Sequence, residues 1–172
     1  MPSRGVFGPE SLQKIQQIIR RYPEGQQRSA LLPVLHLAQH EFGGWLSPKT
    51  MDYVASILGL DPIEVYEVAT FYTMFNLKPT GKHVFQVCHT GPCCLVGAER
   101  IIHYIEKKLG IKAGETTPDG LFTLKRVECL ASCGTAPMMQ LGNAYYEHLT
   151  EEKIDQFIDH LRQAALRDGG AI

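Results

Sequence analysis

The chain has 172 residues, of which 44% are hydrophobic and 20% are charged, and its formal net charge at pH 7 is -1. This balance is typical of a folded globular protein and excludes a largely disordered one. The near-neutral charge, without a block of basic residues, argues against nucleic acid or an anionic membrane surface as the main partner. The sequence contains no window of about 18 uninterrupted apolar residues, so we expect no direct membrane span.

The sequence begins with two segments of helical periodicity. Apolar residues recur at helical spacing from Leu12 to Ile19, and again from Leu31 to Phe42. Ser29 is the expected N-cap of the second helix, and Gly43-Gly44 is its expected stop. Neither segment contains a cysteine.

Two further helices are predicted before the texture of the sequence changes. Ser47-Pro48 has the order of an N-cap followed by a first-turn proline, and Gly59 ends the third helix. The fourth helix begins after Asp61, where Glu64 can complete a capping box. Its apolar stripe continues as far as Phe75. The first half of the chain therefore predicts a small helical bundle.

The aromatic residues of this half have an ordinary structural interpretation. Phe71, Tyr72 and Phe75 lie near the end of the fourth predicted helix. At helical spacing, aromatic residues serve mainly in cores or subunit contacts, so we expect one of these roles rather than an electron path. Trp45, the only tryptophan, is expected to pack within the helical half.

After residue 78 the sequence predicts strands as well as helices. A β-prone segment, His83–Cys88, precedes an amphipathic helix from Val96 to Leu109. A turn at 118–120 leads to a second strand, a hairpin forms around Gly142-Asn143, and Thr150 opens a final helix. We therefore predict an α+β fold with two domains: an N-terminal helical bundle at residues 1–78 and a β-containing domain at residues 79–172.

All five cysteines lie in the second domain, and four of them form two pairs. Cys88 and Cys93 are separated by four residues, and Cys129 and Cys133 by three. Each pair follows a predicted strand and is expected in a loop, and loops from the same end of a sheet can meet. Four thiolates on such loops suit a soft metal centre, either iron–sulfur or zinc. Cys94 is expected to be an ordinary small, partly buried residue.

Spacing alone leaves both metals open. Zinc sites commonly separate paired ligands by about two to four residues, which includes both gaps found here. A thioredoxin-type redox pair needs C-x-x-C, a Rieske site needs two histidine ligands, and plant-type ferredoxins use C-x4-C-x2-C; the sequence has none of these patterns. His89 is expected to be a loop residue or a polar neighbour. The motif favours [2Fe–2S] over a structural zinc.

The compartment is expected to be a reducing cytoplasm. The N-terminus lacks the long apolar run of a secretion signal. In a reducing compartment, an odd number of cysteines serves as metal ligands or redox groups more often than as a disulfide framework.

Residues around the cysteines resemble the thioredoxin-like [2Fe–2S] ferredoxins. The resemblance rests on the Cys88–Cys93 pair, followed after a helix and a strand by Glu-Cys-Leu-x-x-Cys at 128–133, and on the stretch 134–139. The helical half resembles the extension found in one branch of that family, the E subunit of bacterial NADH-quinone oxidoreductases (complex I). The stretches that carry this second resemblance are 28–33, 36–39, 44–46 and 68–75. The two resemblances together extend from about residue 10 to residue 165.

The resemblance implies a fold, a cofactor and partners. It implies a thioredoxin-like domain in which Cys88, Cys93, Cys129 and Cys133 bind one [2Fe–2S] cluster, whereas Cys94 matches no ligand position. It further implies an electron-transfer subunit of an NADH:quinone oxidoreductase on the cytoplasmic side of the cell membrane. Its partners would be the NADH-binding flavoprotein subunit, which holds FMN and NADH, and other peripheral-arm subunits.

The same resemblance leaves related contexts open. An equivalent subunit occurs in NAD(P)-linked hydrogenases and formate dehydrogenases, and a zinc-stapled interaction module remains the alternative from a different class. The chain contains neither a G-x-G-x-x-G motif after a strand nor a G-x-x-x-x-G-K-[ST] motif. We also find no nucleophile–base constellation. The sequence thus predicts a subunit of an oxidoreductase without a complete active site of its own.

Overall fold

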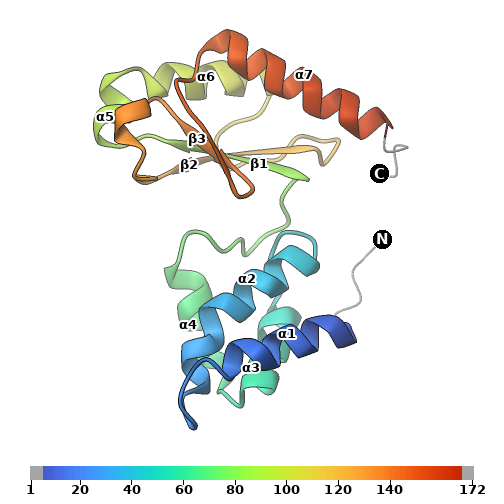
Figure 1. Cartoon of the computed structure of the whole chain (residues 1–172). Coiled ribbons are helices and arrows are strands. Elements are labelled where there is room, and N and C mark those ends of the chain that lie inside the picture. The colour runs from blue at the N-terminus through green and yellow to red at the C-terminus, as the bar shows by residue number, and fades with distance from the viewer. Residues whose placement is uncertain (1–5, 168–172) are drawn as a thin grey trace. The chain divides into compact units, whose positions relative to one another are not determined.

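The computed structural model describes residues 6–167, and the chain divides between Pro79 and Thr80 into two compact units. Between residues 6 and 79 the regular elements of the first unit are all helices, and the second unit combines a sheet with helices (Figure 1). The predicted α+β class is therefore confirmed. None of the helices within residues 6–167 is both long and apolar enough to cross a bilayer.

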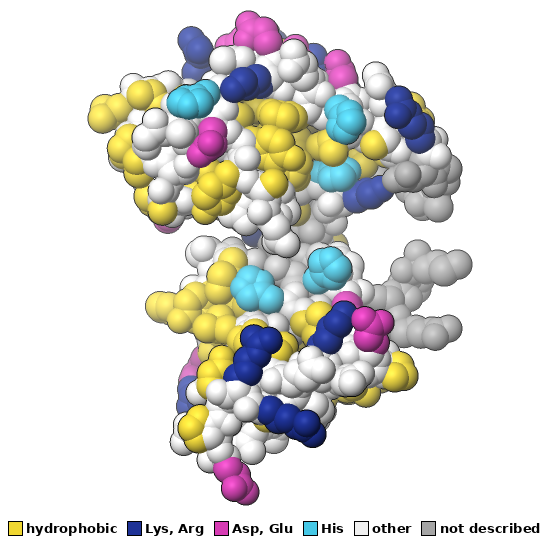
Figure 2. Space-filling view, viewed as in Figure 1, with side chains coloured by type: hydrophobic (Ala, Val, Ile, Leu, Met, Phe, Trp, Pro, Cys, Tyr) yellow, Lys and Arg dark blue, Asp and Glu magenta, His cyan; other side chains and the backbone are white. Residues whose placement is uncertain are grey.

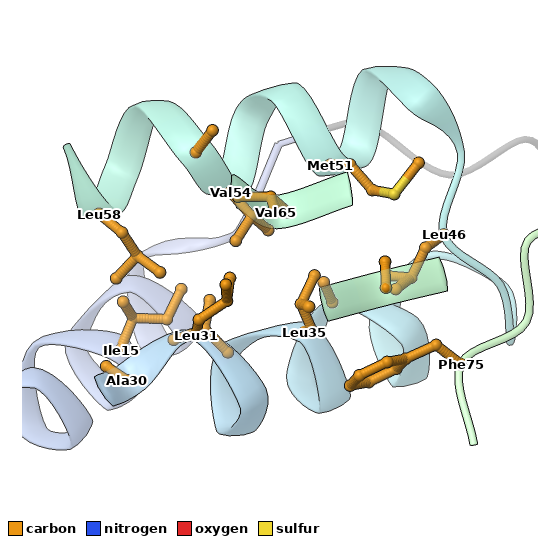
Figure 3. Packing of buried hydrophobic residues seen from close by; sticks show 14 of the residues in the cluster. Ile15, Ala30, Leu31, Leu35, Leu46, Met51, Val54, Leu58, Val65 and Phe75 are labelled. Atoms are coloured by element: carbon orange, nitrogen blue, oxygen red, sulfur yellow. The ribbon is translucent and has the colours of Figure 1, made fainter. Parts of the chain in front are cut away.

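The helical unit is built from four α-helices and one short 3-10 helix. They are α1 (Pro9–Ile19), η1 (Gln27–Ala30), α2 (Leu31–Glu41), α3 (Pro48–Leu58) and α4 (Pro62–Phe71). One buried apolar side chain from each of the four main helices illustrates the core: Ile15, Leu35, Val54 and Val65 are all fully inaccessible to solvent. Figure 3 shows these side chains pointing toward one another, so the four helices share one core.

The predicted caps of α3 and α4 are confirmed, and that of α2 is wrong. Ser47 accepts a hydrogen bond from the Thr50 N–H at 3.1 Å, and Gly59 ends α3 in a left-handed conformation. Glu64 accepts from the Asp61 N–H at 3.1 Å at the start of α4. Ser29, by contrast, lies within the 3-10 helix that precedes α2 and caps no helix.

The fourth helix is also shorter than predicted. It ends at Phe71, and Tyr72 is extended, with φ -88° and ψ 113°. Phe75 nevertheless joins the core, at 4% exposure, and its ring lies 5.0 Å from the His36 ring. Phe71, by contrast, is 77% exposed. A continuous helical stripe would not have separated these two aromatic residues.

The second unit contains a four-stranded mixed sheet. Its elements are β1 (His83–Cys88), α5 (Gly91–Leu95), α6 (Ala98–Leu109), β2 (Phe122–Val127), η2 (Cys133–Thr135), β3 (Met139–Leu141), β4 (Ala144–Tyr146) and α7 (Glu151–Arg167). The strand order is β2-β1-β3-β4. The central strand, β1, pairs in parallel with β2 and antiparallel with β3, and β3 and β4 form the predicted hairpin.

Helices α6 and α7 cover one face of this sheet (Figure 1). Alternate residues of β1, Phe85 and Val87, are fully buried in the same core as Ile105 of α6 and Ile158 of α7. The two helices are also joined by a polar contact, because the Tyr104 hydroxyl donates to Asp155 at 2.8 Å. The resulting two-layer packing buries the apolar face of each element.

Gly81 lies where the backbone of another segment leaves no room for a side chain. A Cβ there would lie 2.8 Å from the carbonyl carbon of Phe122 and 2.9 Å from that of Leu121. The Gly81 N–H also donates to the buried Thr123 hydroxyl at 2.6 Å. No flexible side chain can yield at this point, because the neighbouring atoms belong to the backbone at the start of β2.

We therefore predict that Gly81→Ala destabilises the sheet unit. The expected loss is about 1–3 kcal/mol in the free energy of unfolding, as for other overpacked sites. Urea unfolding followed by circular dichroism measures it. An unchanged midpoint would contradict this close packing.

Candidate metal centre

The register of the sheet brings the two cysteine pairs to one edge. Strand β1 ends at Cys88, and its parallel partner β2 ends at Val127, which is paired with Cys88. Cys129 follows two residues later. Because both strands run in the same direction, the segments that leave them start side by side. The sequence prediction that both pairs emerge from one end of a sheet is thereby explained.

The first pair is buried. Cys88 and Cys93 are 2% and 1% exposed. The chain turns between them through Gly91, at φ 46°, and Cys93 lies in the short helix α5 rather than in the loop that the sequence predicted. Cys94 follows Cys93 in α5 but is exposed, so the expectation that it is partly buried is wrong.

The second pair is exposed and close together. The Sγ atoms of Cys129 and Cys133 are 3.9 Å apart. Ala131, between them, has a left-handed backbone at φ 61°, and its N–H donates to the Cys129 sulfur at 3.4 Å. Two thiolates about 2.3 Å from one tetrahedral metal ion lie roughly 3.8 Å apart. This pair therefore has the spacing of two ligands on one metal.

Hydrogen bonds to the sulfurs connect the two segments. Burial raises the pKa of the Cys88 thiol, but donation from the backbone of Thr90 and Leu130 and from the Cys93 thiol outweighs burial, so the pKa of Cys88 is lowered. Leu130 belongs to the segment of the second pair. A backbone donor from the second cysteine segment thus supports the sulfur of Cys88 in the first, and this donation favours the thiolate form of Cys88.

The remaining thiols respond mainly to their neighbours. Burial, followed by the hydrogen bond and charge of Cys88, raises the pKa of Cys93 to about 11. The pKa of Cys133 is raised by its hydrogen bond to Cys129 and by the charge of that sulfur. Crowded thiols resist simultaneous ionisation unless a cation compensates their charge.

The donors come as two pairs rather than as one cage. Within residues 6–167, no three His, Cys, Asp or Glu side chains converge on a single metal-ion position. Cys88 and Cys93 are hydrogen-bonded to each other, as Cys129 and Cys133 are. Four soft thiolates in two pairs are a donor set that could hold a [2Fe–2S] cluster.

Polar residues around the cysteines form a network that the sequence analysis did not identify. Glu147 accepts hydrogen bonds from the hydroxyls of Ser132 and Thr135, which flank Cys133. On the other side, the His89 ring lies 3.7 Å from the Glu128 carboxylate, so the residue after Cys88 meets the residue before Cys129. In the sequence, Ser132 and Thr135 near Cys133 are the signal for such a network. The sequence does not indicate that their partner is Glu147.

A shallow pocket of about 420 Å³ lies elsewhere on the same unit. It surrounds the end of α6 and is lined by His103, Glu106, Lys107, Gly110, Ile111, Lys112 and Glu115. Its charges partly pair, since Lys112 lies 3.5 Å from Glu106. None of the five cysteines lines it, so the thiol pairs form a separate feature.

Comparisons with known proteins identify the family of this chain. Residues 15–162 match the family described as thioredoxin-like [2Fe-2S] ferredoxin. The chain is 49% identical over 157 residues to the E subunit of the NADH-quinone oxidoreductase of Rickettsia conorii, covering 91% of this chain and 94% of the relative. It is 47% identical over 156 residues to the mitochondrial "NADH dehydrogenase [ubiquinone] flavoprotein 2" of Dictyostelium discoideum, covering 91% of this chain and 63% of the relative.

Solved structures show the same fold in a larger protein. The chain superimposes on the crystal structure of an air-oxidised NAD+-reducing [NiFe]-hydrogenase with a TM-score of 0.68 and 18% sequence identity. The match covers 81% of this chain but only 24% of the hydrogenase chain. At this identity the likeness concerns the fold alone.

Proposed function

Because the chain belongs to the thioredoxin-like [2Fe–2S] ferredoxin family, we propose that it is the [2Fe–2S] electron-transfer subunit of an NADH:quinone oxidoreductase. The cluster ligands in this proposal are Cys88, Cys93, Cys129 and Cys133, and Cys94 is not a ligand. The observation that carries the proposal is the meeting of two thiol pairs at one end of the sheet. The high identity to a protein named as the E subunit of an NADH-quinone oxidoreductase supports the choice of complex.

The chain's own part in the chemistry is to hold and balance charge. When bound, a four-thiolate [2Fe–2S] cluster supplies a centre that takes up one electron at a time at low potential. Backbone N–H groups of Thr90 and Leu130 donate to the Cys88 sulfur, and that of Ala131 donates to Cys129. Such donors compensate negative charge on the sulfurs, and they favour the reduced state more than the oxidised one.

A partner must supply the substrate chemistry in this proposal. NADH delivers a hydride, whereas the proposed centre handles single electrons, so a flavin is needed between them. We assign FMN and NADH to the NADH-binding flavoprotein subunit, and we expect other peripheral-arm subunits to complete the complex. We place the complex on the cytoplasmic side of the cell membrane, since free thiols and NADH both suit a reducing compartment.

The helical unit is proposed to provide the docking surface for that flavoprotein subunit. It contains no cysteine, and it exposes four large apolar side chains in sequence order near the end of α4: Phe71 at 77%, and Tyr72, Met74 and Leu77 at 39% each. Figure 2 shows hydrophobic side chains gathered on this side of the helical unit. Exposed apolar groups of this density are typical of protein interfaces.

A structural zinc is the alternative from a different class. Cysteine spacing permits it, but zinc cannot change oxidation state, so the electron-transfer function would be lost with it. Metal identity is therefore the first test of the proposal. A place in a hydrogenase or a formate dehydrogenase would keep the same cluster chemistry and change only the complex.

We expect the anaerobically purified chain to contain about two irons and two sulfides and no stoichiometric zinc. Its EPR spectrum should be silent when oxidised and should show a spin-one-half signal after dithionite. Elemental analysis and EPR measure both properties. About one zinc per chain with no signal in either state would overturn the proposal.

The ligand assignment predicts opposite results for neighbouring cysteines. Serine at Cys88, Cys93, Cys129 or Cys133 should weaken cluster binding or alter its spectrum, because a soft thiolate ligand is lost. Cys94→Ala should leave iron content and spectrum unchanged, because this exposed side chain is outside the two pairs. Cys94→Ala therefore serves as the matched control. Loss of the signal in that variant would refute the assignment.

The docking surface predicts a selective binding defect. Phe71→Ser should weaken binding to the NADH-binding flavoprotein subunit about tenfold or more, as loss of a central aromatic residue does at interfaces. Cluster content should not change. Ile63→Ser is the control, because Ile63 lies at the other end of α4 and is also exposed, at 65%. Biolayer interferometry measures the affinity of each variant for the flavoprotein subunit. Equal affinities of Phe71→Ser and Ile63→Ser would contradict the placement of the docking surface at the end of α4.

A further inference from the structure

Glu147 is placed beside the second cysteine pair by its own backbone. The His148 N–H donates to the Thr135 carbonyl at 2.8 Å, and the Leu149 N–H donates to the Pro137 carbonyl at 2.8 Å. These two bonds lay the segment that follows β4 along the segment that follows Cys133. The left-handed conformation of His148, at φ 48°, bends the chain at this point. The position of Glu147 is therefore built by the fold and does not depend on a mobile surface side chain.

The side chain of Glu147 closes a network around Cys133. Its Oε1 atom accepts from the Ser132 hydroxyl at 2.5 Å and from the Thr135 hydroxyl at 2.6 Å. The two hydroxyl oxygens are themselves 2.7 Å apart. One carboxylate oxygen thus ties together the residue before Cys133 and the second residue after it. Both hydroxyls donate to the Glu147 carboxylate.

The carboxylate carries its charge at neutral pH. Hydrogen bonds from Ser132 and then from Thr135 hold the pKa of Glu147 below its usual value. The Lys153 ammonium donates to the backbone carbonyl of Glu147 at 3.0 Å. The other carboxylate near the cysteines, Glu128, is 77% exposed and faces His89. Of these two carboxylates, only Glu147 is hydrogen-bonded to the segment that holds Cys133.

We propose that Glu147 is a positioning residue that anchors the Cys129–Cys133 segment, and that its negative charge lowers the reduction potential of the cluster held there. The inference rests on the proposed function. Reduction adds an electron to a centre that is already anionic, so a fixed negative charge nearby opposes it. In a redox titration, the electron that dithionite supplies must enter the cluster against this repulsion. The anchoring of the segment and the effect on the reduction potential both come from the Glu147 carboxylate, but they are measured separately.

The test compares Glu147→Gln with the wild-type chain, both loaded with the cluster. Glutamine keeps an acceptor oxygen for the two hydroxyls and removes the charge. At a fixed solution potential near the wild-type midpoint, the ratio of reduced to oxidised cluster should rise about tenfold, which is about 59 mV for a one-electron couple. EPR-monitored redox titration measures the ratio, and iron and sulfide content should stay at the wild-type level.

Two further variants separate charge from anchoring. Glu151→Gln removes a carboxylate four residues away that faces Arg100 at 3.6 Å; it is the charge-matched control, and its ratio should stay within about twofold of wild type. Ser132→Ala keeps the charge of Glu147 and removes one donor. It should release iron to a chelator about threefold faster, as expected when a partly buried hydrogen bond is lost, without raising the ratio.

Each outcome supports or overturns the inference. A Glu147→Gln ratio within twofold of wild type overturns the role of the charge, as does an equal rise in Glu151→Gln or Ser132→Ala. An unchanged iron release rate in Ser132→Ala overturns the anchoring role. If Glu147→Gln takes up no cluster, the iron release rate of Ser132→Ala is the measurement that supports or overturns the inference. Absence of iron and sulfide from the wild-type protein would instead overturn the proposed function. Failure of the proposed function and failure of the Glu147 inference are therefore distinguishable.

Discussion

The parallel pairing of β1 with β2 is the constraint on which the rest of the site depends. It places Cys88 opposite Val127, so that segments separated by some forty residues of chain leave the sheet together. Because register in a sheet with one buried face is fixed by which side chains must point inward, Phe85 and Leu124 select it. A slip of one residue would turn these core residues outward. The geometry of the cysteines is therefore a consequence of hydrophobic packing some distance away.

The two cysteine pairs differ in their exposure to solvent, and this difference decides how negative charge on their sulfurs is compensated. Cys88, at the end of β1, and Cys93, in α5, are buried, whereas Cys129 and Cys133 are exposed. Sulfur in the buried pair depends on backbone donors such as the Leu130 N–H for charge compensation. Sulfur in the exposed pair can also be compensated by water. The protein thus controls charge at one side of the site by its own dipoles and leaves the other side accessible, where a partner can approach.

In the proposed function, the sheet unit carries the chemistry and the helical unit carries the association with a partner. The helical unit buries apolar side chains from each of its four main helices and still leaves Phe71 exposed. Burying that ring would have been favourable in an isolated domain. Its exposure follows from the end of α4, because the extended conformation of Tyr72 turns the chain before the stripe is complete. The sheet unit carries the thiols and the Glu147 network instead.

The sequence by itself determined the α+β class, the caps at Ser47 and Gly59, the hairpin at Gly142 and the two cysteine pairs. These features depend on residues close together in the chain, where periodicity, turn chemistry and spacing are sufficient. The sequence did not reveal the short helix α5 around Cys93, the early end of α4 or the hydrogen bonds of Glu147 to Ser132 and Thr135. Each of these was decided by contacts between distant segments. Helix α5 is only five residues long, so propensity alone could not stabilise it, and Glu147 meets Ser132 only because β3 and β4 return the chain to the cysteine edge of the sheet.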